Sequence, residues 1–196
     1  STFQTISGWE ATAEIGESEC DRTAFLLYRS TVLDKGVNEV GINRIRLELK
    51  SGAESPTDHF MQLYNGQITR DAYRALRYNP INDNSDPFTA NPAGFQWSAF
   101  DQKVDEIVNP IRQRLLARGE QLMISLNYVD FKGTPTAFNQ LDNAEEYAEL
   151  ITEAFKHLQQ KYGWVPNAVE LLLEPDITPW NGTHLGRAVV ATANRL

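Results

Sequence analysis

Residues 168–176, AVELLLEPD, constrain the fold more than any other part of the chain. Apart from Glu170, an apolar run precedes Glu174, as expected for a strand of a parallel sheet that is buried on both faces. Pro175 has no N–H group, so the predicted strand ends there and holds Glu174 at its carboxyl end. Parallel α/β folds carry their chemistry at this end of their strands. Glu174 is therefore either a reactive carboxyl group or a strand-end residue that simply meets solvent.

Three further strands are predicted upstream, and helices alternate with all four. The strands are expected at about residues 2–6, 42–49, 122–128 and 168–173, and the helices at about 22–39, 98–118, 142–162 and from 183 onward. Pro110 is expected to kink the second of these helices. Strands that alternate with helices predict an α/β fold of parallel βα repeats with right-handed crossovers. The 196 residues are expected to form a single domain.

The segment 50–97, which follows the second strand, is much longer than an ordinary connection. It contains turn signals such as Asn65-Gly66 and Asp86-Pro87, and one short helix is expected at about 69–76. Seven aromatic side chains in this insertion favour an ordered structure with a small apolar cluster of its own. A loop of this kind can cover a functional site.

Composition limits the partners of the chain. The net charge of −8 and the pI of about 4.9 provide no basic surface for nucleic acid or for an anionic membrane. Cys20 is the only cysteine, so an internal disulfide and a multi-cysteine zinc site are excluded, and the three histidines are too scattered to predict a metal site. No apolar run reaches membrane-spanning length, and residues 1–10 do not resemble a signal peptide. Neither a metal nor another cofactor is expected, and both a secreted and a cytoplasmic location stay open.

Polar and aromatic side chains gather where the predicted strands end. They are Trp9 and Glu10, then Arg46 and Glu48, then Asn127, Tyr128 and Asp130, then Glu174 and Asp176. This distribution suits a (β/α)₈ barrel, in which the active site combines residues from several strand ends. For Arg46 and Glu48, an ordinary solvent-facing sheet surface is the alternative. Because bulky residues follow Gly8, no glycine-rich phosphate loop is predicted after the first strand.

Three short motifs resemble the clan-A retaining glycoside hydrolases. They are Gly-Ile-Asn-Arg-Ile-Arg on the second strand, Ser-Leu-Asn-Tyr on the third and Leu-Glu-Pro-Asp on the fourth. The resemblance implies that Glu174 is the acid/base and that Arg46 supports a glutamate nucleophile at the end of strand seven. Leu173 departs from the family pattern, because an asparagine that contacts the sugar 2-OH stands there in the family. The chain contains four βα units where a barrel has eight, so it resembles the N-terminal half of such an enzyme.

The resemblance implies a carbohydrate substrate and a second polypeptide half. Retaining hydrolysis needs two carboxyl groups about 5–5.5 Å apart, and the nucleophile would come from the missing half, so the chain alone is expected to be inactive. Trp9, Glu10, Asn127, Tyr128 and Trp180 are the candidate substrate-binding residues, with core packing as the alternative for the aromatic ones. Glu10, Glu48 and Asp130 are expected to be supporting or solvated carboxylates. The alternative function is a non-catalytic carbohydrate-binding or structural half-barrel, completed by a partner or by self-association.

Overall fold

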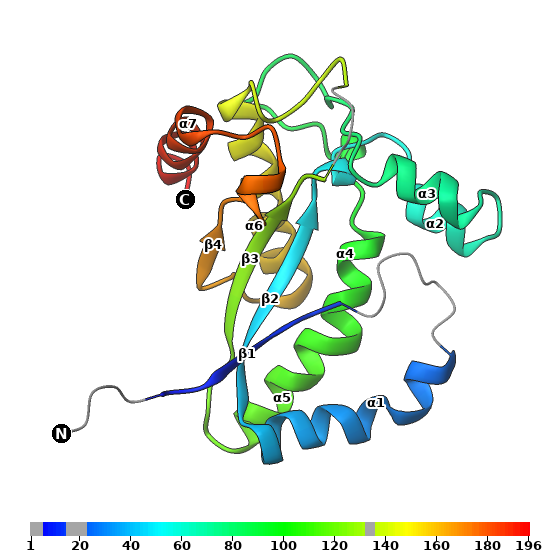
Figure 1. Ribbon diagram of the computed structural model, residues 1–196, viewed down its shortest axis with the longest axis vertical. Helices are drawn as coiled ribbons and strands as arrows, with labels where there is room; N and C mark the ends of the chain where they lie inside the picture. Colours follow the sequence, from blue (N-terminus) through cyan, green and yellow to red (C-terminus); the bar gives the residue numbers. More distant parts are fainter. Residues whose placement is uncertain (1–5, 15–22, 132–135) are drawn as a thin grey trace.

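A four-stranded parallel sheet lies at the centre of the computed structural model, which describes residues 6–14, 23–131 and 136–196 (Figure 1). The strands follow one another across the sheet in chain order: β1 (Trp9–Thr12), β2 (Ile42–Lys50), β3 (Met123–Val129) and β4 (Ala168–Glu170). All three neighbouring pairs are parallel. The predicted α/β fold of alternating βα units is therefore confirmed.

The two faces of the sheet differ in character because side chains alternate along each strand. On β2, Ile45, Leu47 and Leu49 are buried in the core. Their register partners Ile124, Leu126 and Tyr128 on β3 are buried with them. The opposite face, called here the polar face, carries Arg44, Arg46, Glu48, Ser125 and Asn127.

The helices of the βα units pack against the apolar face. They are α1 (Thr23–Lys35), α4 (Ser98–Lys103), α5 (Asn109–Ala117), α6 (Ala144–Tyr162) and α7 (Gly182–Ala193). Single π-helical turns extend α1 (η1, Gly36–Val40) and join α4 to α5 (η4, Val104–Val108). Apolar side chains of α1, α5 and α6 belong to the same core cluster as Leu47 and Leu126. Figure 1 accordingly shows α6 behind β2 and β3.

Helix ends follow the signals in the sequence. Gly163 ends α6 with a φ of 75°, which glycine adopts at little cost. Asn181 caps α7 by accepting hydrogen bonds from the backbone N–H groups of Thr183 and His184, and the His184 ring accepts one in return from the Asn181 N–H. Pro110 lies in the first turn of α5, and the irregular part of this helical stretch is the π-helical turn η4 directly before it, as expected where a proline removes a helical N–H.

The insertion 50–97 is ordered, as its aromatic content predicted. It contains η2 (Ser51–Ala53), α2 (His59–Tyr64), α3 (Arg70–Leu76) and η3 (Pro92–Gly94). An antiparallel bridge between Glu54 and Phe95 closes it at its base, and the Ser55 N–H donates to the Gly94 carbonyl at 2.7 Å. The insertion is therefore a loop whose two ends are fixed next to the end of β2.

Two strand predictions need correction. The first strand is Trp9–Thr12, whereas Ile6 is outside any strand and residues 2–5 lie outside the described residues. The fourth strand ends at Glu170, although the Leu173 N–H still donates to the Tyr128 carbonyl at 2.9 Å. Regular pairing thus stops before the apolar Leu171–Leu173 run, and the chain follows β3 irregularly as far as Glu174.

Candidate active site

Arg46, Glu48 and Asn127 come together at the carboxyl end of the polar face. Alternation along β2 places Arg46 and Glu48 on the same side, and Glu48 is the register partner of Asn127 on β3. An Arg46 guanidinium nitrogen lies 3.9 Å from the Glu48 carboxylate. Glu48 is 7% exposed and Asn127 is completely buried, so the group is screened from solvent although it lies on the polar side of the sheet. The burial of Glu48 does not fit an ordinary solvated sheet surface, whereas the Arg46 side chain, 26% exposed, still meets solvent.

Two lysines and a second glutamate surround Glu48. The Lys103 ammonium group, from α4, forms an ion pair with Glu14 and lies 3.5 Å from the Glu48 carbonyl oxygen. Burial raises the pKa of Glu48 to about 7, although the charge of Lys103 opposes the rise. Burial also lowers the pKa of Lys50 to about 7. Burial alone would raise the pKa of Glu14. The charges of Lys103 and Lys50 outweigh this effect and lower the pKa below its usual value. A carboxyl group with a pKa near 7 can both donate and accept a proton at neutral pH.

Several polar atoms of this site have no partner within the described residues. They are both side-chain polar atoms of Asn127 and the Nε of Arg46, and all three are inaccessible to solvent. A buried polar group without a hydrogen bond costs about 1–3 kcal/mol. A ligand that offers hydroxyl groups can supply the missing hydrogen bonds, because the Asn127 amide both donates and accepts. Asn127 thus has an amide without a partner in the described residues, but because it is completely buried a ligand could reach it only after neighbouring side chains move.

Glu174 follows β4 in an unusual backbone conformation. With a φ of 49° and a ψ of 61°, it is the one non-glycine residue of the described ranges in the left-handed region. A β-carbon there costs about 1–2 kcal/mol, and such strain often accompanies function. The η5 turn (Pro175–Ile177) follows at once, and the Glu174 side chain is exposed. Glu174 is thus accessible to a substrate, but it is not buried in the way that was expected of a strand-end acid.

Trp9 and Glu10 lie at the wrong end of the sheet for the role predicted for them. Trp9 pairs with Ile42, the first residue of β2. Trp9 and Glu10 are therefore the first residues of β1 and do not follow its carboxyl end. Both are exposed, and Glu10 forms a 3.9 Å ion pair with Arg44. The carboxyl end of β1 is instead extended by Ala13 and Glu14, and the Ala13 N–H donates to the Arg46 carbonyl at 2.9 Å. Glu14, which the sequence did not single out, is therefore the β1 contribution to this site.

Tyr128 and Trp180 are core residues. Tyr128 is completely buried, Trp180 is 5% exposed, and both rings pack edge-on against Tyr147 with centroids 4.9 and 5.7 Å away. The Trp180 Nε1–H donates to Asp130, and the Tyr128 hydroxyl donates to Gln140. Their burial fits the core-packing alternative and leaves no ring face for a sugar. Asp130 likewise accepts from Ser51 and Trp180 in the interior, so it is a buried hydrogen-bond acceptor and not a solvated carboxylate.

Comparison with known proteins adds no information about this site. Among the residues that the structure describes, no helix has the length and apolar character needed to cross a bilayer. Compared with models of protein families, with curated proteins and with solved structures, the chain matches none of them.

Proposed function

We propose that this chain forms the N-terminal half of a retaining glycoside hydrolase, with a (β/α)₈ barrel as the complete fold. Glu174 is the acid/base in this proposal, Arg46 supports the nucleophile, and a second half of the barrel supplies that nucleophile. The observation that carries the proposal is the sequential strand order of a fully parallel sheet with its apolar side packed against the helices.

The strand order favours a barrel over an open, doubly wound sheet. Doubly wound sheets reverse their strand order at a switch point and so place helices on both faces. Here the order β1-β2-β3-β4 never reverses, and right-handed crossovers then put every connecting helix on the same face. Four more units of this kind would close the sheet and turn the polar face inward.

The polar face has side chains that suit sugar chemistry. Asn127 offers an unpartnered amide, and the ionisable group of Glu14, Glu48 and Lys103 lies at the same carboxyl end. In the complete barrel, the second half would cover the Glu174 carboxyl group, which is exposed here, and shield it from bulk water. Leu173 provides no amide for a sugar hydroxyl, and the free amide of Asn127 on the neighbouring strand supports the same kind of contact.

Replacement of Glu174 by glutamine in the complete protein tests this assignment. The amide fills the same volume but cannot donate a proton, so kcat should fall about 10²–10⁴-fold for natural glycosides. The loss should be smaller for substrates with good leaving groups, and added azide should partly restore turnover, because a small anion replaces the activated water. Asp71→Asn, at a fully solvated position of the insertion outside the strand-end set, is the control and should leave kcat unchanged. Equal losses for both substrate types, without an effect of azide, would contradict the assignment.

The competing proposal is a non-catalytic carbohydrate-binding or structural half-barrel, which the leucine at position 173 and the exposure of Glu174 favour. The two proposals differ in what must complete the sheet. A catalytic half needs a partner segment with a strand-end glutamate, whereas a binding module needs only a surface that covers the polar face. Sequencing of the gene beyond the codon for residue 196 separates them, because four further βα units with such a glutamate support the enzyme.

A further inference from the structure

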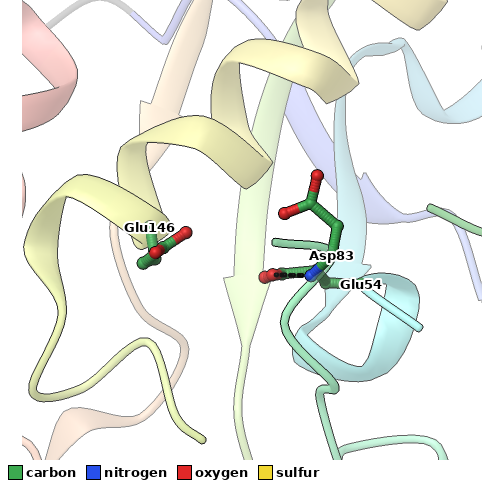
Figure 2. Close-up of side chains that lie close together, drawn as sticks. All are labelled: Glu54, Asp83 and Glu146. Atoms are coloured by element: carbon green, nitrogen blue, oxygen red, sulfur yellow. Dashed lines mark hydrogen bonds between the residues drawn. The ribbon is translucent and has the colours of Figure 1, made fainter. Parts of the chain in front are cut away.

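A second group of carboxylates lies at the base of the insertion, separate from the polar face. Glu54, Asp83 and Glu146 each place a carboxylate oxygen within 4.8 Å of the others (Figure 2). Glu54 follows the η2 turn after β2, Asp83 lies in the second half of the insertion, and Glu146 lies in the first turn of α6. Three segments that are far apart in the sequence thus meet at one point.

Neighbouring groups hold Glu54 and Asp83 in place. One Glu54 oxygen accepts from the Gln140 amide at 2.7 Å and the other from the Asp83 backbone N–H at 3.4 Å. One Asp83 oxygen accepts from the Asn84 side chain and from the Asn91 N–H. Gly94 packs so closely against Asp83 that an added β-carbon would lie 2.2 Å from the Asp83 Cβ. These contacts fix the carboxylates without neutralising their charge.

The remaining oxygens of the group are buried without a partner within the described ranges. They are Asp83 Oδ1 and Glu146 Oε2, and the side-chain amide oxygen Oδ1 of the neighbouring Asn82 is in the same situation. Asn82 also donates to the other Glu146 oxygen at 3.2 Å, so it lies next to the group. Each such oxygen loses its hydration without receiving a hydrogen bond in exchange, which is costly for a charged carboxylate.

Glu149 is a second observation that favours a cation at this carboxylate group. It lies one turn after Glu146 on α6, is 3% exposed, and neither of its carboxylate oxygens has a hydrogen-bond partner in the described structure. Glu149 thus adds a buried carboxylate without a hydrogen-bond partner three residues after Glu146, on the same side of α6.

We propose that Glu54, Asp83 and Glu146 bind a calcium ion. Glu149 and the side-chain amide oxygen of Asn82 complete the oxygen shell. Calcium prefers six to eight oxygen ligands at about 2.3–2.6 Å, including carboxylates and amide carbonyls. Its flexible coordination geometry suits oxygens that come from three separate segments and meet within 4.8 Å of one another. Magnesium demands near-octahedral geometry, usually keeps several waters and takes only one or two protein carboxylates, so a group of buried carboxylates suits it less well.

The bound ion would fasten the insertion to α6. Glu54 and Asp83 belong to the insertion, and Glu146 and Glu149 belong to the helix, so a shared ion joins the two directly. The Tyr128 hydroxyl donates to Gln140, whose amide donates to Glu54, so the same contacts continue to β3 in the core. We therefore expect the ion to stabilise the fold without a part in the proposed glycosidic chemistry.

Calcium titration of the full chain, followed by thermal melting and by calorimetry, tests the proposal. Calcium at about 100 times its Kd should raise the Tm by about 5–10 °C, and excess EDTA should reverse the shift. Glu146→Gln should weaken calcium binding at least tenfold and yet raise the Tm in EDTA, because it removes one of the crowded carboxylate charges. Glu153→Gln on the same helix, where Glu153 pairs with Lys156, is the control and should bind calcium like the wild type.

Three outcomes would overturn the proposal. The first is a chain whose Tm and heat of mixing do not respond to millimolar calcium. The second is equal calcium affinity of the wild type and Glu146→Gln, with Asp83→Asn as the second variant if Glu146→Gln does not fold by circular dichroism. The third is tighter binding of magnesium than of calcium. None of these measurements uses glycosidase activity, so they succeed or fail independently of the proposed function.

Discussion

Asp101 joins α4 to the C-terminal end of α6, and its replacement by asparagine gives a quantitative test of this packing. Its carboxylate accepts from His157 at 2.6 Å, from Lys161 at 2.9 Å and from the Tyr162 hydroxyl at 3.1 Å, and its side chain is 15% exposed. A hydrogen bond to a charged group contributes about 1.5–3 kcal/mol, whereas the half-exposed Lys161 contributes about 0.5 kcal/mol or less. Because the asparagine oxygen still accepts one hydrogen bond, we expect Asp101→Asn to lower the free energy of unfolding by about 2 kcal/mol at pH 7.

The effect should depend on pH in a defined direction. Burial acts to raise the pKa of Asp101, but the hydrogen bonds from His157 and Lys161 outweigh it and hold the pKa below 3.8. A carboxyl group whose pKa is lowered by folding stabilises the protein above its unfolded pKa and loses that contribution as the pH falls through its folded pKa. The difference between wild type and Asp101→Asn should therefore be full at pH 7 and shrink steadily below about pH 4.

Urea unfolding at pH 7, 5 and 3, followed by tryptophan fluorescence, measures this difference. Asp71→Asn is the matched control, since Asp71 is 93% exposed and pairs only loosely with Arg74 at 3.7 Å. We expect the control to change the free energy of unfolding by less than about 0.5 kcal/mol at every pH. A deficit for Asp101→Asn that is the same at pH 3 and pH 7, or one no larger than that of the control, would refute the reasoning.

Three further predictions concern assembly, the polar face and one turn. Sedimentation should show the chain with a partner or as a dimer, because the sheet has open edges and apolar residues such as Leu27, 84% exposed, face solvent. A stable, monodisperse monomer would contradict the half-barrel. Arg46→Lys in the complete protein should reduce kcat/KM more than Tm, because lysine keeps the charge but not the guanidinium geometry, and equal losses would make Arg46 a structural residue. Gly119→Ala should lower the free energy of unfolding by about 1 kcal/mol, since Gly119 has a φ of 74°, whereas Gly182→Ala, which meets no neighbour, should change it by less than about 0.5 kcal/mol in a melting assay.

Local patterns predicted the elements whose signals are strong and continuous. The alternating β-formers of the second strand and the helical spacing before Gly163 led to the correct bounds of β2 and α6 within one or two residues. Polar side chains between buried ones on β2 also predicted that Arg46 and Glu48 share a face. These features depend on neighbours in the sequence, so they can be read without knowing the fold.

Features that depend on distant parts of the chain could not be predicted in this way. The first strand was placed too early because residues 2–6 have good β-propensity, whereas the pairing of Trp9 with Ile42 fixes its true position. The burial of Tyr128, on β3, and of Trp180, just before α7, arises from packing against Tyr147 on α6.

The proposed calcium site was missed for a related reason. Histidine and cysteine patterns can reveal a metal site in a sequence, whereas Glu54, Asp83 and Glu146 share no motif and meet only in the folded chain. Such a site has no local signal beyond a carboxylate in each of three segments.

The sequential strand order also affects how the chain can assemble during synthesis. Each strand pairs with one already made, so the sheet can grow from the N-terminus as the ribosome releases it. The steps are unequal, however: Ser7 and Asn43, which join β1 to β2, are 36 residues apart, while Ser51 and Asp130, at the ends of β2 and β3, are 79 apart. Closing the longer loop costs about 0.7 kcal/mol more in chain entropy if the insertion is still unfolded. Early folding of the insertion around its Glu54–Phe95 bridge would shorten that loop, and docking of β3 would then cease to be the slowest pairing.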